Sequence, residues 1–261
     1  MPDAIRSPEE FPEARTVEDF KTNIAAVRQR IADAAARVGR DSDDIRLLAV
    51  SKTVPEERIR LAVAAGLKEL GENRVQEATA KYHAMQDLDI RWSIIGNLQT
   101  NKARDVAAYA AEFQALDRLR VAEVLDRRLE AAGRTLPVFV QVNTSNEPQK
   151  YGIHPDEILE FLTALQDYPR LKVQGLMTLA VFTPEVERVR ECFVLLRNLR
   201  DQMLDEAPAL IGPGELSMGM SGDYEVAIEE GATVVRVGQA IFGARETPDS
   251  YYWPGMAEPD N

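Results

Sequence analysis

The sequence predicts a single TIM-like (β/α)8 barrel with an extra helix before the first strand. Its 261 residues, 45% of them hydrophobic, are enough to form one large core. Eight short β-type runs alternate with helical segments, which is typical of parallel strands joined by helical crossovers. The alternative is a doubly wound open sheet. No Gly-x-Gly-x-x-Gly motif follows the first strand, so the usual dinucleotide fingerprint of that fold is absent from the sequence.

The first predicted element is a helix over residues 17–38. Its apolar residues recur with the three- and four-residue spacing of one helix face: Phe20, Ile24, Val27, Ile31 and Ala34. This helix precedes the first strand and is additional to the eight strand-helix repeats.

The eight predicted strands follow in chain order, at residues 45–50, 67–70, 92–95, 112–116, 136–142, 171–177, 215–218 and 233–237. Pro55 and Pro155 are each followed by two acidic residues, which suits the first turn of a helix. Gly66, Gly133 and Gly231 suit helix ends, where a left-handed backbone is favoured.

The chain divides into three predicted segments. Residues 1–16 are rich in proline and acidic residues and are expected to be a disordered N-terminal tail. Residues 17–245 form the predicted barrel. Residues 246–261 again carry prolines and are expected to be an irregular C-terminal tail.

Composition excludes several classes of function. The 31 basic and 43 acidic residues give a net charge of −12, which repels nucleic acid and anionic membrane surfaces. No segment approaches the roughly 20 apolar residues of a membrane span. A single cysteine, Cys192, favours a reducing, cytoplasmic compartment, and its helical spacing among apolar residues predicts a core position.

Three segments together predict a cofactor that carries an aldehyde and a phosphate. Lys52 ends the first strand run, where an amine can form a Schiff base with an aldehyde. Ser217 and Gly238 follow the last two strands, where barrels commonly bind phosphate. Arg236 would face the ring. These are the requirements of pyridoxal 5'-phosphate (PLP).

Each of these residues also has a purely structural interpretation. Lys52 could be a solvated surface charge. Arg236 could be an ion-pair partner of one of three acids, Glu69, Glu72 or Glu229. Ser217 and Ser221 could cap the following helix, and Asn73 could cap another.

Six segments resemble one known family in order and spacing. They are residues 49–53 (AVSKT), 71–77 (GENRVQE), 95–102 (IGNLQTNK), 175–177 (GLM), 216–221 (LSMGMS) and 235–243 (VRVGQAIFG). The family is that of the pyridoxal phosphate homeostasis proteins, also called PROSC or PLP-binding proteins. Its members resemble the N-terminal barrel of alanine racemase. The resemblance covers roughly residues 20 to 245.

This resemblance implies a set of cofactor contacts and no established catalytic residue. The implied contacts are Lys52 as the Schiff-base lysine, Arg236 at the pyridine nitrogen, Ser217 with the amides near Gly238 and Gln239 at the phosphate, and Asn73 and Met177 along the ring.

The resemblance also implies a function in intracellular vitamin B6 homeostasis. A permanently charged arginine cannot accept the proton of the ring nitrogen, so carbanion chemistry would be weakly supported. Alanine racemase adds a tyrosine base from a second, all-β domain, and this chain stops soon after the eighth strand. We therefore expect a monomeric PLP carrier or buffer without catalytic turnover, whose partners could include PLP-dependent apoenzymes.

Two other functions stay open. The first is a small PLP enzyme such as a weak amino-acid racemase, for which Lys150, Tyr151 and His154 are the nearby base candidates, although a solvated loop is the favoured interpretation of these residues. The second is a scaffold without a cofactor. No metal site is expected, because His83, His154 and Cys192 form no recognisable ligand cluster.

Overall fold

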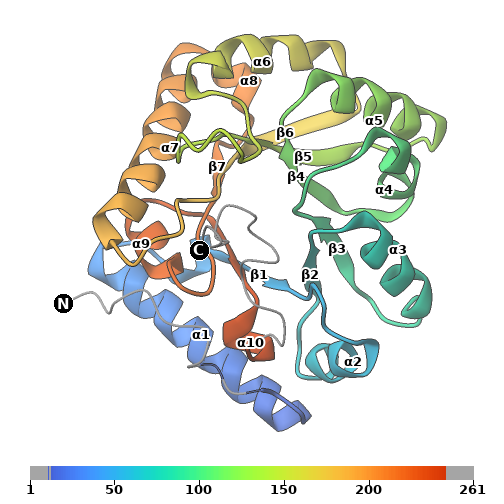
Figure 1. The fold of residues 1–261 in the computed structure, drawn as a ribbon, viewed down its shortest axis with the longest axis vertical. Coiled ribbons are helices and arrows are strands. Elements are labelled where there is room, and N and C mark those ends of the chain that lie inside the picture. The colour runs from blue at the N-terminus through green and yellow to red at the C-terminus, as the bar shows by residue number, and fades with distance from the viewer. Residues whose placement is uncertain (1–10, 12, 245–261) are drawn as a thin grey trace, which may run out of the picture.

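The computed structural model describes residue 11 and residues 13–244. Within this part the eight strands form a closed parallel barrel in chain order, and β8 pairs back with β1 (Figure 1). The helices surround the strands, as Figure 1 shows. The predicted (β/α)8 barrel is confirmed, and the open-sheet alternative is wrong.

The strands are β1 (Arg46–Val50), β2 (Glu69–Glu72), β3 (Arg91–Ile94), β4 (Glu112–Leu116), β5 (Leu136–Gln141), β6 (Leu171–Met177), β7 (Glu215–Ser217) and β8 (Val234–Val237). The helices are α1 (Val17–Arg37), α2 (Glu56–Ala64), α3 (Val75–Ala84), α4 (Ala103–Tyr109), α5 (Leu119–Ala131), α6 (Ile158–Ala164), α7 (Val186–Glu206), α8 (Pro208–Ile211), α9 (Tyr224–Glu229) and α10 (Gln239–Phe242). Short 3₁₀ turns lie at Ser42–Asp44, Thr100–Lys102, Pro155–Glu157 and Leu165–Asp167.

Strand β2 differs most from its predicted position, residues 67–70, because both of its ends lie two residues further along the chain. The prediction began the strand at Leu67, whereas the structure begins it at Glu69. The Leu67 amide donates to the Ala62 carbonyl, and the amide of Gly66, with φ +108°, donates to Val63. This pattern closes the C-terminus of α2, so the Leu67 amide completes the helix and not the sheet.

Helix α1 packs on the outside of the barrel beside α9 and α10 (Figure 1). Its N-cap Thr16 forms a capping box with Asp19. The Phe20 ring meets the Phe242 ring edge-on, with centroids 5.5 Å apart, and Asn23 Nδ2 donates to the Ile241 carbonyl over 3.0 Å. The extra helix is therefore part of the barrel's packing.

Both predicted tails fall largely outside the described residues, namely 1–10, 12 and 245–261. The described part of the N-terminal segment contacts the body of the protein. Ala14 is buried, and its carbonyl accepts a hydrogen bond from Arg58 Nε.

One smaller prediction concerns a single residue: Cys192 is buried in α7, as predicted for a core cysteine. His83 is exposed on α3. Within the described ranges, no group of histidine, cysteine and acidic side chains could hold a metal ion. No helix in this part of the chain is long and apolar enough to cross a membrane.

Candidate functional site

The carboxyl ends of the strands bring the predicted cofactor residues to one face of the barrel, the face that carries active sites in this fold. Lys52 follows β1, Asn73 follows β2, Met177 ends β6, Ser217 ends β7, Arg236 lies in β8, and Gly238 and Gln239 follow β8. Strands β1 and β8 are paired, with Ala49 opposite Val237. The half-buried Lys52 therefore lies beside the end of β8, close in register to Gly238.

The two residues that flank Lys52 are held by acidic side chains from β2 and α3. Ser51 Oγ donates to Glu72 Oε1 over 2.6 Å, and the Thr53 amide donates to Glu77 Oε1 over 2.6 Å. Thr53 has φ +65°, an uncommon backbone conformation for a β-branched residue. Because this strained turn is held on both sides of Lys52, the backbone position from which the Lys52 side chain extends is restricted.

A buried lysine joins these two acids. Lys81 Nζ donates to Glu72 Oε1 over 2.7 Å, to Glu77 Oε1 over 2.6 Å and to the Ser51 carbonyl over 2.7 Å. Burial raises the pKa of Glu72 to about 7, although Lys81 lowers it. We refer to Ser51, Glu72, Glu77 and Lys81 as the Lys52 clamp.

Arg236 is almost completely buried, with 2% of its surface exposed. One terminal nitrogen donates to Ser217 Oγ and the other to the Thr178 carbonyl, both over 2.7 Å. Burial lowers the pKa of the guanidinium to about 10, an effect that the nearby Asp223 opposes. Arg236 therefore stays charged at neutral pH while both of these hydrogen-bond partners are neutral.

The ion-pair interpretation of Arg236 is not supported. The three candidate acids pair with other cations: Glu69 with Arg46, Glu72 with Lys81, and Glu229 with Arg37 and Arg190. Asp223, which none of these pairs involves, is the acid that acts electrostatically on Arg236.

Ser221 and Ser217 have different surroundings, and neither caps α9. The N-cap of α9 is Asp223, and it has no side-chain capping bond. Ser221 Oγ accepts from the Gly238 amide over 3.1 Å and from the Ala240 amide over 3.5 Å. Ser217 Oγ instead points into the barrel, where it donates to a glutamine on β4 over 2.7 Å.

Asn73 has a buried polar atom without a partner. Its Oδ1 makes no hydrogen bond within the described residues, and the N-cap of α3 is Arg74, so Asn73 does not cap that helix. A Cβ on Gly96 would lie 2.1 Å from the Asn73 carbonyl oxygen, so only glycine fits there. The close backbone approach fixes Asn73 at the mouth, where its amide can serve a ligand.

Comparisons with known proteins identify the family of this chain. The family model described as "Alanine racemase, N-terminal domain" matches residues 22–246. The pyridoxal phosphate homeostasis protein of Aquifex aeolicus is 42% identical over 223 residues, which cover 85% of this chain and 97% of that protein. This chain belongs to the pyridoxal phosphate homeostasis protein family. The resemblance read from the six motifs is confirmed.

Two further relatives place the chain within this family. The pyridoxal phosphate homeostasis protein of Pseudomonas aeruginosa is 43% identical over 224 residues, covering 86% of this chain and 95% of that protein. The solved structure of PipY from Synechococcus elongatus with PLP bound is 34% identical. That match covers 86% of this chain and 100% of PipY, with a TM-score of 0.76.

The base candidates in the loop after β5 have other contacts. Lys150 Nζ donates to the Ala180 carbonyl over 2.9 Å and pairs with Glu147. Tyr151 is 59% exposed, and His154 is exposed and caps the 3₁₀ turn that follows it. The exposure of Tyr151 and His154 fits the interpretation of a solvated loop, whereas Lys150 does not fit it, because only 13% of its side chain is exposed.

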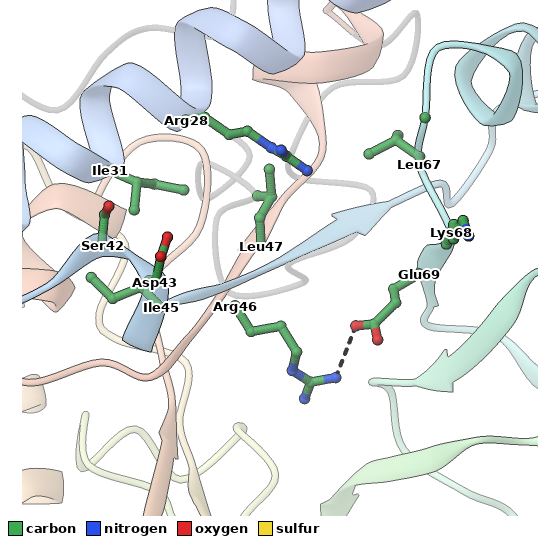
Figure 2. A pocket seen from close by; sticks show the side chains of 11 residues that line it. Arg28, Ile31, Ser42, Asp43, Ile45, Arg46, Leu47, Leu67, Lys68 and Glu69 are labelled. Carbon is green, nitrogen blue, oxygen red and sulfur yellow. Dashed lines mark hydrogen bonds and ion pairs between the residues drawn. The ribbon is translucent and has the colours of Figure 1, made fainter.

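A cavity of about 470 Å³ lies at the opposite end of the barrel. Arg46 and Glu69, the first residues of β1 and β2, form an ion pair at its edge, and Arg28 extends towards Leu47 from α1 (Figure 2). Lys52 lies past the other end of β1, so this cavity is not part of the predicted cofactor site.

The sequence analysis missed the residues that support the site. Glu72, Glu77 and Lys81 were not predicted to act on Lys52, although the first two lie in the GENRVQE motif and Lys81 is one helical turn beyond Glu77. Glu112 and Gln114 were also missed. Two polar residues at alternate positions of an otherwise apolar strand are the signal that could have found them.

Proposed function

We propose that this chain binds PLP at the mouth of the barrel and acts in intracellular vitamin B6 homeostasis as a carrier or buffer. Its membership of the pyridoxal phosphate homeostasis protein family supports this function, as does the related PipY structure with PLP bound. The observation that carries the proposal is the Lys52 turn, held beside the end of β8 next to a buried, charged Arg236.

The residues at the mouth fit this cofactor. A Schiff base needs an amine, which Lys52 supplies. Asn73 Oδ1, which has no hydrogen bond to the described residues, would give the ring side a polar contact. When bound, PLP supplies an aldehyde for Schiff-base formation and a ring that can withdraw electrons. Arg236 would face the ring nitrogen, and the buried Met177 would pack along the ring.

The phosphate would lie near Ser221 and the Gln239 amide, since the Gly238 amide gives its proton to Ser221 Oγ. The hydrogen bonds of Ser221 Oγ within the described residues are accepted ones, which leaves its proton able to donate to an anion. The Ser217 hydroxyl gives its only proton to a glutamine on β4, so we propose that Ser217 acts through Arg236 and not by donating to the phosphate.

Catalytic turnover is not favoured. An arginine at the ring nitrogen does not hold a proton there as a carboxylate would, so carbanion stabilisation is weak. The weak-racemase alternative would need Lys150 or Tyr151 as a base. A test is exchange of the α-proton of an amino acid in deuterated buffer: exchange that is lost on Tyr151→Phe or Lys150→Ala would favour the enzyme.

Three further aspects belong to this proposal. We propose that PLP-dependent apoenzymes receive the cofactor, that the chain acts as a monomer, and that it works in the cytoplasm, where its single cysteine stays reduced. Mixing the loaded protein with an apoenzyme, with and without a dialysis membrane between them, separates direct transfer from release.

The binding experiment is a titration of purified protein with PLP, followed by visible absorption. We expect a Schiff-base band with the wild type and with Lys68→Ala, a matched loss of an exposed lysine at the other barrel end. Lys52→Ala should lose the band. A wild type that takes up no PLP, or a Lys52→Ala variant with an unchanged band, would contradict the proposal.

A further inference from the structure

A chain of hydrogen bonds crosses the interior of the barrel below Arg236. Ser217 Oγ on β7 donates to Gln114 Oε1 on β4 over 2.7 Å. Gln114 Nε2 donates to Glu112 Oε1 over 2.6 Å, and Arg46 on β1 donates to Glu112 Oε2 over 2.8 Å. Strands β4 and β7 are not neighbours, and nor are β1 and β4, so these bonds span the barrel.

The polarity of this chain is fixed at both ends. An ionised carboxylate only accepts, so Glu112 requires the NH2 group of the Gln114 amide and turns its oxygen towards Ser217. Ser217 then gives its single proton to that oxygen and presents lone pairs to Arg236. A guanidinium only donates, so each donor along this series of hydrogen bonds meets an acceptor.

The hydrogen-bond chain is also buried from Glu112 to Arg236. Gln114 and Ser217 have no exposed surface, and Arg236 has 2%. A buried amide or hydroxyl without its partner is costly, so the bonded arrangement has few alternatives. Glu112 also accepts from Ser93 Oγ over 2.7 Å, a side branch outside the path from Arg46 to Arg236.

We propose that Gln114 is a positioning residue for Arg236: it sets the Ser217 hydroxyl as an acceptor and thereby aims the guanidinium at the ring nitrogen of bound PLP. This rests on the proposed function, because it assumes that Arg236 faces that ring. Gln114 does not touch the cofactor in this account. Its effect passes through two hydrogen bonds.

The test compares two ligands, PLP and 1-deazapyridoxal phosphate, in which carbon replaces the ring nitrogen. The variants are Gln114→Met, which keeps the side-chain length but removes the amide, and Ser217→Ala. Ser93→Ala is the matched control, because it removes an equally buried hydroxyl from Glu112 but no link to Arg236. Each protein is titrated by absorption, and its melting temperature is measured without ligand.

We expect Gln114→Met and Ser217→Ala to weaken PLP binding by about 10- to 100-fold, the effect of one lost hydrogen bond to a charged group. Binding of the deaza analogue should change less than twofold, since it offers no nitrogen to Arg236. Ser93→Ala should bind both ligands within twofold of the wild type.

The outcomes separate the two proposals. If the wild type binds neither ligand, the proposed function fails. If it binds PLP but Gln114→Met leaves the affinity unchanged, or weakens both ligands equally, the positioning role of Gln114 is wrong. If Gln114→Met is too unstable to purify, Ser217→Ala decides the same question, because it breaks the neighbouring link of the chain.

Discussion

At the scale of single residues, Lys81 is the side chain that contacts all three other members of the Lys52 clamp. Its ammonium contacts two carboxylates and the Ser51 carbonyl in a buried setting. Removing one member of such a group leaves uncompensated charge, which costs more than the group contributes as a whole. The clamp therefore affects both stability and the position of Lys52.

We expect Lys81→Met to lower the free energy of unfolding by about 3 to 5 kcal/mol and to weaken PLP binding in the protein that remains folded. Denaturant unfolding and a PLP titration measure the two effects. The double variant Glu72→Gln/Lys81→Met should recover part of the stability. Equal stability of wild type and Lys81→Met would contradict this account.

The raised pKa of Glu72 predicts a pH dependence of stability. Burial raises the pKa from its ordinary 4.5 to about 7, so the folded state binds the proton more tightly than the unfolded state. This contribution is present below about pH 4.5 and is lost as the pH rises to about 7. Over this pH range the free energy of unfolding decreases by at most about 3 kcal/mol through Glu72.

We expect Glu72→Gln, which cannot titrate, to gain stability relative to the wild type as the pH rises from 5 to 8. Urea unfolding of both proteins at several pH values checks this. A difference between the two that stays constant over this range would show that Glu72 does not titrate as its burial implies.

Sequence alone predicted the residues that carry recognisable chemistry, such as Lys52 and Arg236, because their positions follow from strand ends. It did not predict Gln114, since its role depends on a contact with Ser217 across the barrel, 103 positions along the chain. Contacts between strands that are not neighbours depend on which side chains meet inside the closed barrel, and no local pattern encodes that.

At the scale of elements, α1 supports α10, the short helix that follows Gly238. Phe20 packs on Phe242, and Asn23 donates to the Ile241 carbonyl, so two contacts from α1 reach the segment proposed to hold phosphate. The helical spacing of apolar residues predicted α1 well. Its partner could not be predicted, because an amphipathic pattern shows which face is buried but not against what.

We expect Phe20→Ala to lower the free energy of unfolding by about 3 to 5 kcal/mol, because the ring is fully buried. It should also weaken PLP binding by loosening α10. Val38→Ala, a truncation of an exposed residue just after α1, is the control and should have little effect on either quantity. A Phe20→Ala protein that loses stability but binds PLP normally would show that α1 does not support the phosphate region.

At the scale of the whole molecule, the barrel separates two ends with different features. The carboxyl ends of the strands carry Lys52 and the Gly238 region, and the amino ends carry the cavity beside Arg46 and Glu69. The hydrogen-bond chain from Arg46 to Arg236 connects them through the interior. The sequence predicted the closed barrel because strand and helix patterns alternate eight times, but the interior chain could be seen only in the structure.

The central claim is that Lys52 is the residue that holds PLP. The most direct measurement is borohydride reduction of the PLP-loaded protein, which traps a Schiff base, followed by mass mapping of the modified peptide. The account predicts one stable adduct on Lys52. An adduct found on other lysines only, or none in a protein that binds PLP, would contradict it.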